Sequence, residues 1–248
     1  MLVVSGASFP SVSQWQEPSR KRGTAINTDG QNHDEKDLGS IEVGPLGTSD
    51  VKDALAVLAR GMQNNPNHVA VFGEDPAIRV ARLGVLFERV NALAGWQALA
   101  ARDPKRGMVG VMMMLRPGTC RHSPLEQLRS APGPHPDDPK VAAAIVQWLQ
   151  AWRERDPEER HWHFGPFAVE AHLQGRGVGS ELMRVVCAQM DAGRENAYLE
   201  TDIRKSVGFC ERFGFEVVGE QTVLGAPNWF MMRRPRGGVD VSEEGMST

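Results

Sequence analysis

A glycine-spaced segment, Gln174-Gly175-Arg176-Gly177-Val178-Gly179, limits the possible folds of this chain more than any other feature. The apolar run 167–169 precedes it, and apolar residues at helical spacing follow from 177 to about 191, which places the glycines at a strand-to-helix turn. Glycine lets the backbone turn tightly and approach a ligand closely. The following helix begins with unpaired N–H groups and a partial positive charge, so the turn can hold a pyrophosphate, with Arg176 at its rim.

The residues of the turn leave two interpretations open. It is not a P-loop, because no Gly-Lys-Ser/Thr follows the glycines. It fits a dinucleotide-binding fingerprint poorly, because the third glycine is out of register and no early strand–turn–helix precedes it. The segment alone therefore predicts either an anion site or a tight loop without a ligand.

Hydrophobic periodicity predicts strands and helices over most of the chain. Residues 48–50 are candidates for the N-cap of a first helix, which the breaker cluster Asn64–Asn67 should end. A second helix, from 75 to about 93, should bury Ile78, Val80, Leu83, Leu86, Phe87 and Val90. We expect strands at 41–46, 95–101, 108–115, 161–169, 197–200, 215–220 and 229–233, and further helices at 141–153, 177–191 and 204–212.

The two ends of the chain differ from its middle. Residues 1–40 carry almost no periodic apolar pattern, so they are expected to form a disordered leader that cannot offset its ordering entropy by burial. Residues 41–234 are expected to form a single domain with an insertion at 116–160, a proline-rich loop followed by an extra helix. Residues 235–248 are expected to be a flexible tail.

Composition excludes several classes of function. No apolar run among the 248 residues approaches the roughly 20 that a membrane helix needs. A net charge of −3 gives no electrostatic argument for binding nucleic acid or a membrane. Three cysteines cannot all pair within one chain, which favours free thiols and a cytoplasmic location.

Two motifs together point to a known family. Gln174, Gly177 and Gly179 fit the pattern Gln/Arg-x-x-Gly-x-Gly/Ala, and the segment Phe209-Cys210-Glu211-Arg212-Phe213-Gly214-Phe215 follows about 30 residues later. The pair resembles the motifs of the GNAT superfamily of N-acetyltransferases, closely over 160–234 and in element order over 41–115. The resemblance implies an α/β (α+β) fold with a mixed, mostly antiparallel central sheet, splayed central strands and helices on both faces. Residues 197–201 look most like the puromycin N-acetyltransferase branch and its actinobacterial relatives.

The resemblance also implies acetyl-CoA as the co-substrate and direct transfer of its acyl group to an amine. The pantetheine arm would pair with the bulged strand near Phe167, Ala168 and Val169, and a backbone N–H at Phe167 or Ala168 would bind the oxyanion. Pro166 lacks an N–H, which a bulge tolerates. The pyrophosphate would bind Gln174, Gly175, Arg176, Gly177, Val178, Gly179 and Ser180.

Three residues are candidates for proton transfer. His163 lies eleven residues before Gln174, where the histone acetyltransferase branch of the family places its catalytic glutamate, and imidazole suits a base at neutral pH. Glu200 is a second candidate for the base, or a carboxylate that holds the substrate ammonium. Either residue can instead be structural. Cys210 stands where the family usually has the tyrosine that protonates the CoA thiolate, and a thiol can donate a proton in its place.

His161 and His163 project to the same side of a strand, so they are also the beginning of a possible metal site. No third ligand at a characteristic spacing is visible, and the family needs no metal. We therefore expect no metal centre.

These observations predict an acyl-CoA-dependent N-acyltransferase that acetylates a small-molecule amine. The alternative is a catalytically impaired acyl-CoA-binding module with a regulatory role, which the cysteine at position 210 favours. Self-protection against an antibiotic is a third hypothesis that rests only on the resemblance to the puromycin branch. A homodimer is left open.

Overall fold

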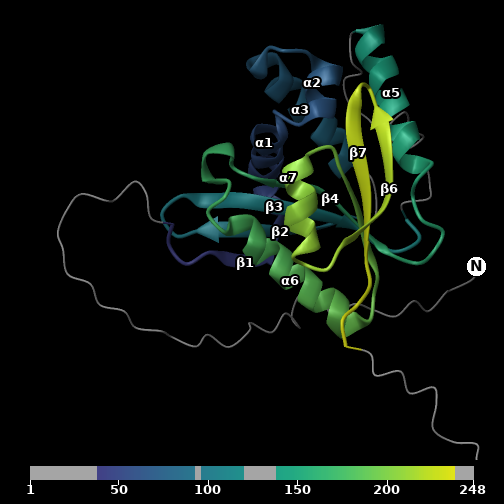
Figure 1. The fold of residues 1–248 in the computed structure, drawn as a ribbon. Helices are drawn as coiled ribbons and strands as arrows, with labels where there is room; N and C mark the ends of the chain where they lie inside the picture. Colours follow the sequence, from purple (N-terminus) through teal and green to yellow (C-terminus); the bar gives the residue numbers. More distant parts are fainter. Residues whose placement is uncertain (1–37, 93–95, 120–137, 238–248) are drawn as a thin grey trace, which may run out of the picture. The chain divides into compact units, whose positions relative to one another are not determined.

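A seven-stranded sheet forms the centre of the structure, a computed structural model that describes residues 38–92, 96–119 and 138–237 (Figure 1). The strand order is β1-β2-β3-β4-β5-β7-β6. All neighbouring strands are antiparallel except β4 and β5, which run parallel. The strands are β1 (Glu42–Pro45), β2 (Trp96–Asp103), β3 (Gly107–Leu115), β4 (Trp162–Val169), β5 (Ala197–Thr201), β6 (Glu216–Val223) and β7 (Ala226–Arg233).

Helices cover both faces of the sheet (Figure 1). Side chains alternate along β3, so Val111 and Met113 join the apolar cluster to which α1 and α3 contribute. A Cβ at Gly110 would instead lie 3.0 Å from the side chain of Val178 in α6, which places α6 on the opposite face. The helices are α1 (Val51–Met62), α2 (Pro66–Phe72), α3 (Pro76–Asn91), α5 (Pro139–Arg153), α6 (Val178–Gly193) and α7 (Arg204–Glu211).

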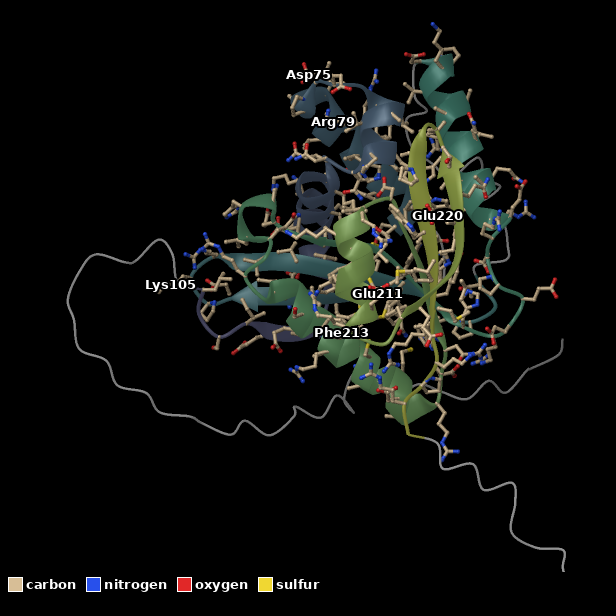
Figure 2. The ribbon with its side chains drawn as sticks, viewed as in Figure 1. Asp75, Arg79, Lys105, Glu211, Phe213 and Glu220 are labelled. Atoms are coloured by element: carbon tan, nitrogen blue, oxygen red, sulfur yellow. The ribbon has the colours of Figure 1, made fainter. Side chains whose placement is uncertain are left out.

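Helix α3 is fixed at its first turn by local capping and by a buried arginine (Figure 2). The Asp75 carboxylate accepts hydrogen bonds from the backbone N–H of Ala77 at 2.8 Å and of Ile78 at 3.2 Å. One turn further, Arg79 is buried and donates to the carbonyl oxygens of Gln63 and Gly73. These bonds connect α3 to the end of α1 and to the end of α2.

Two local predictions were wrong in part. The Asn64–Asn67 cluster ends α1 as expected, but Pro66 then begins the short helix α2, because proline is favoured at the first helical position. Ile78, predicted to be buried, is 48% exposed because residues 73–78 all lie on the surface at the start of α3. Leu83 and Phe87, further along the same helix, are buried as predicted.

The predicted fold class is confirmed: the sheet is mixed and mostly antiparallel, with helices on both faces. Among the described residues, no helix combines the length and the apolar character needed to cross a bilayer. Residues 1–37 of the predicted leader, 120–137 of the predicted insertion at 116–160, and 238–248 of the predicted tail lie outside the described residues. The division into leader, domain and tail stays a prediction.

Candidate active site

The parallel strands at the centre of the sheet separate soon after they meet. β4 and β5 pair only at Trp162–Ala197 and at His163–Tyr198, although β4 continues to Val169. The other edge of β4 stays paired with β3 to Val169, and it carries a bulge near Gly165-Pro166, as predicted. Beyond His163, the edge of β4 that faces β5 is therefore open.

A cavity of about 540 Å³ occupies this opening. Gly175, Gly177, Gly179 and Ser180 line its glycine end, next to the open edge of β4. Side chains from α3, α5, β4 and β5 line its other end, which we call the acceptor end. The acceptor end includes Phe87, Trp96, Trp148, Trp152, Asp156, His163, Glu200 and Asp202.

The turn at the glycine end has the backbone geometry that its sequence predicts. Gly175 and Gly177 have φ of 79° and 92°, a left-handed conformation that other residues rarely adopt. No atom lies within 4 Å of a Cβ added at either position, so the glycines meet open space. Gln174 anchors the turn, because its amide donates to the carbonyls of Gly61 and Val169 at 3.0 and 3.1 Å.

The first backbone N–H groups of α6 are available to an anion. Glu181 is the first residue of the helix whose N–H finds an acceptor in the preceding turn, the Gly177 carbonyl at 3.1 Å. Among the described residues, the N–H groups of Val178, Gly179 and Ser180 have no such partner. A Cβ at Gly179 would lie 3.3 Å from the Phe167 ring, so glycine there also allows helix and strand to pack closely.

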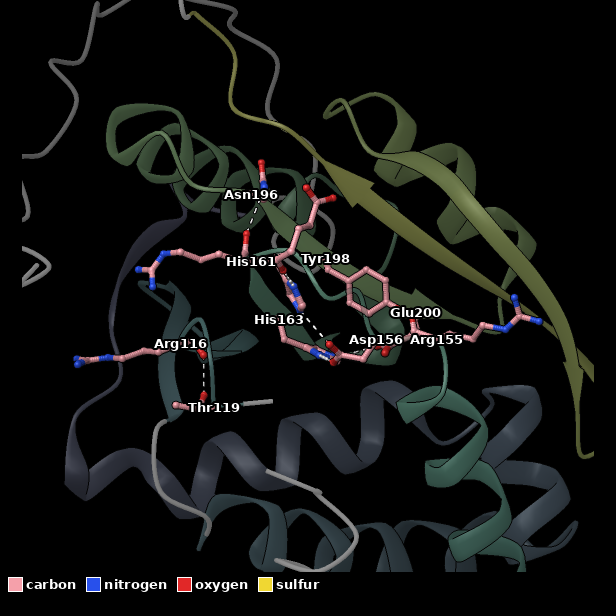
Figure 3. A network of polar contacts seen from close by, with 11 residues as sticks. Arg116, Thr119, Arg155, Asp156, His161, His163, Asn196, Tyr198 and Glu200 are labelled. Atoms are coloured by element: carbon pink, nitrogen blue, oxygen red, sulfur yellow. Dashed lines mark hydrogen bonds and ion pairs between the residues drawn. The ribbon is translucent and has the colours of Figure 1, made fainter. Parts of the chain in front are cut away.

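At the acceptor end, His163 lies between two carboxylates (Figure 3). Its Nε2 is 2.9 Å from a Glu200 oxygen, and its Nδ1 is 3.3 Å from an Asp156 oxygen. Both carboxylate side chains are largely buried, at 3% and 9% exposure. The structure thus brings the two base candidates together and adds Asp156, which the sequence analysis did not single out.

A neutral imidazole cannot satisfy both carboxylates, because it has one N–H donor and one lone pair. Buried carboxylates without a compensating positive charge are costly. A cation beside Asp156 would compensate this negative charge. Both ring nitrogens of His163 already face carboxylates, and Glu200 lines the cavity, so Glu200 is the better candidate for the proton acceptor.

His161 completes the polar cluster on the same side of β4. Its Nδ1 is 2.7 Å from the Glu159 carbonyl, and its Nε2 is 3.5 Å from an Asp156 oxygen. The Tyr198 ring contacts both histidines and its hydroxyl donates to the Arg155 carbonyl at 3.1 Å. The sequence shows no third potential ligand at a characteristic spacing, but the chain after α5 brings Asp156 beside the two histidines. The absence of a metal centre stays a prediction.

Cys210 lines the cavity but is a weak acid there. The thiol is 4% exposed, and burial raises its pKa to about 12. An ordinary thiol has a pKa of about 8.5, so proton transfer from Cys210 to a free thiolate is uphill. Cys210 is therefore a poor proton donor to a departing thiolate.

Two more polar residues at the acceptor end were missed. His68 is buried, and burial lowers its pKa despite the 2.7 Å contact of its Nδ1 with the Met62 carbonyl, so it is neutral near pH 7. Asp202 accepts from the Asn67 backbone N–H at 2.7 Å and from the Asn65 amide at 3.3 Å. No sequence motif marks either residue, because each is placed beside the cavity only by tertiary contacts.

Comparison with known proteins agrees with this geometry. Residues 139–217 match the family model of the acetyltransferase (GNAT) domain, a stretch that contains β4, the glycine turn, α6, β5 and α7. The matched stretch contains both the glycine turn and the 209–215 segment, so it agrees with the resemblance to the GNAT superfamily that these two motifs carry.

Two solved structures are similar to this chain. A protein described as histone acetyltransferase HPA2 and related acetyltransferase, from Corynebacterium glutamicum, is 23% identical with a TM-score of 0.59, over 81% of this chain and 99% of that one. The ribosomal-protein-S18-alanine N-acetyltransferase of Escherichia coli is 12% identical with a TM-score of 0.48, over 82% and 100%. The first similarity shows the fold, and neither identifies the acceptor.

Proposed function

We propose that this protein transfers an acetyl group from acetyl-CoA to the amine of a small molecule. The observation that carries the proposal is the opening between β4 and β5. A single cavity there joins the free N–H groups of α6 to the carboxylate of Glu200. An acyl donor and an amine can therefore meet in one place.

The residues of the glycine end fit the polar parts of CoA. The N–H groups of Val178, Gly179 and Ser180 and the positive end of α6 suit its pyrophosphate. The turn is exposed and lacks side chains at Gly175 and Gly177, so phosphates can come close to the backbone. The open edge of β4 offers hydrogen bonds to the amides of the pantetheine arm.

Backbone alternation in β4 favours Phe167 as the oxyanion donor. The Glu170 N–H donates to the Val109 carbonyl of β3 at 2.9 Å. The backbone N–H and C=O groups of successive residues in a strand point to opposite edges. Those of Val169 and Phe167 therefore point away from β3 and toward the opening. The Val169 carbonyl agrees with this, because it accepts from Gln174 rather than from β3. The Ala168 N–H points toward β3, which leaves Phe167 as the better candidate.

The transfer needs a group that accepts the proton of the amine and a way for the CoA thiolate to leave. The amine nitrogen attacks the thioester carbon, the new C–N bond forms, and the C–S bond breaks to release the CoA thiolate. Glu200 takes the proton lost by the amine, and His163 holds that carboxylate in position. The Cys210 thiol is too weakly acidic to protonate the thiolate. An ordinary thiol has a pKa of about 8.5, so the CoA thiolate can leave unprotonated and equilibrate with the solvent after release.

The acceptor end supports a small molecule. The whole cavity, including the glycine end, has a volume of about 540 Å³, so the acceptor end has room only for a small group. Its wall combines the aromatic rings of Trp96, Trp148 and Trp152 with the carboxylates of Glu200 and Asp202. An amine attached to an apolar or aromatic body matches that combination. Membership of the puromycin branch, an antibiotic as the acceptor and a homodimer stay predictions.

A second candidate function is acyl-CoA binding without turnover. The observation that favours it is Cys210, a buried thiol in the position of the family's usual acid. Such a protein would bind acetyl-CoA at the same turn and sense it rather than consume it.

Thiol release separates the two functions. Full-length protein is incubated with acetyl-CoA and a panel of small aromatic and aliphatic amines, a polyamine and a basic peptide, and free CoA thiol is measured. We expect thiol release with at least one small amine and little with the peptide. Acetyl-CoA binding without turnover on any amine, unchanged in Cys210→Tyr, would support the binding module instead.

A further inference from the structure

We propose that Asp156, His161 and His163 bind a divalent transition metal ion, with zinc as the ion that suits them best. Asp156 follows α5, and the two histidines lie at the start of β4, so the site joins the end of a helix to the central sheet (Figure 3). The inference is independent of acetyl transfer, because it rests on the ligand atoms alone.

The spacing of the ligand atoms fits a tetrahedral ion. One carboxylate oxygen of Asp156 lies 3.5 Å from His161 Nε2, and the other lies 3.3 Å from His163 Nδ1. Bonds of about 2.0–2.1 Å at tetrahedral angles place ligand atoms about 3.3–3.4 Å apart. All three ligand atoms lie within 4.8 Å of one another, close enough to surround one ion.

The remaining ring nitrogens are held as metal-binding histidines require. His161 Nδ1 contacts the Glu159 carbonyl at 2.7 Å, and a carbonyl can only accept, so Nδ1 carries the proton and Nε2 faces Asp156. His163 Nε2 faces the Glu200 carboxylate at 2.9 Å, so its Nδ1 is directed to Asp156. A second hydrogen bond to carbonyl or carboxylate is the usual support of a ligating imidazole.

Burial and charge favour an ion over water in this place. The side chains of His161, Asp156 and His163 are 3%, 9% and 18% exposed. Asp156 and Glu200 are carboxylates on either side of His163, so a divalent ion beside Asp156 would lie in a region of negative charge. Two imidazole nitrogens and one carboxylate oxygen are a ligand set that zinc accepts.

The proposed ion would adjoin the acceptor end of the cavity. Asp156 and His163 line the cavity, whereas His161 lies behind them. With three protein ligands, the fourth position can be taken by water from the cavity. The ion would fix His163, and through it the orientation of Glu200.

Zinc binding tests the site directly. Full-length protein is freed of metal with a chelator, and zinc is titrated in competition with a chromophoric chelator. We expect one equivalent to bind, and the affinity to fall by about a hundredfold or more in Asp156→Asn and in His163→Gln. His172→Ala is the matched control, because His172 is an exposed histidine on the neighbouring turn, and it should bind zinc like the unmodified protein.

Two further readouts do not depend on how well the variants fold. The X-ray absorption spectrum of the zinc-loaded protein should show nitrogen and oxygen ligands, including two imidazoles, without sulfur. Zinc should raise the thermal unfolding temperature of the unmodified protein relative to the chelated form. Sulfur ligation, or equal zinc affinity in the unmodified protein and in Asp156→Asn, would overturn the proposal.

Discussion

The two ends of the cavity differ in the groups that line them: backbone groups at one end and side chains at the other. At the glycine end, neighbouring residues of one continuous segment supply backbone N–H groups, and side chains are kept away by Gly175 and Gly177. At the acceptor end, side chains from several separate elements supply carboxylates, imidazoles and aromatic rings. A backbone site binds what most CoA-dependent proteins share, the pyrophosphate, whereas a side-chain site can be changed residue by residue to fit one acceptor. The comparison predicts that mutations at the two ends affect different properties.

The largest expected effect is on the glycine end. Gly177→Asp should weaken CoA binding by at least about a hundredfold, or about 2.8 kcal/mol. The φ of 92° disfavours a side chain, and the new carboxylate would repel the pyrophosphate. Titration calorimetry with CoA measures the loss. Gly84→Asp is the matched control, because its added Cβ also meets open space but lies in α3 away from the cavity. Unchanged CoA affinity in Gly177→Asp would refute the role of the turn.

The next effect separates catalysis from binding at the acceptor end. Glu200→Gln should lower the rate of thiol release by about a hundredfold or more, because the amide cannot take a proton from the amine. CoA affinity should change by less than about twofold, because the amide keeps the shape of the side chain and binding resides at the other end. Glu220→Gln, an exposed change on β6, is the control. An unchanged rate in Glu200→Gln would show that water, rather than Glu200, accepts the proton of the amine.

A smaller effect is expected on stability, when a buried hydrogen bond that holds an acceptor-end side chain is removed. Asn228 is fully buried, and its carbonyl oxygen accepts from the Trp152 indole at 2.8 Å. Asn228→Ala should lower the free energy of unfolding by about 1–3 kcal/mol, since it leaves buried donors without a partner. Urea denaturation measures the loss. Asn196→Ala, which removes an exposed hydrogen bond to the Arg160 carbonyl, should cost less. Equal losses in both variants would contradict the assignment of the buried network.

The smallest effect is a dependence on pH. Burial raises the pKa of Cys187 to about 11 and that of Cys210 to about 12. An unfolded thiol has a pKa of about 8.5, so above that pH the unfolded state loses these protons before the folded state does. The free energy of unfolding should therefore fall as the pH rises from about 8.5 toward about 11. Cys210→Ala should make that slope shallower, and an unchanged slope would show that the thiol is not protected.

The sequence predicted the glycine end and most of the fold. The order of strands and helices follows from apolar spacing. The turn follows from glycines at positive φ values that other residues rarely adopt. Helix α2 was missed because Pro66 is both a helix breaker and a favoured first residue of a helix. His163 and Glu200 were named as candidates from motif spacing, but their contact was not foreseen. Asp156 was not singled out as a site residue.

The sequence by itself determined what depends on neighbouring residues: a strand, a glycine turn and a helix whose first N–H groups can bind an anion. Only the tertiary structure decided what depends on distant residues. It separated β4 from β5 after His163, and it placed Asp156 and Glu200 on either side of that imidazole. The physical reason is that helix ends and glycine conformations are local properties of the backbone. The charge balance around a buried histidine is set instead by every element that packs against it.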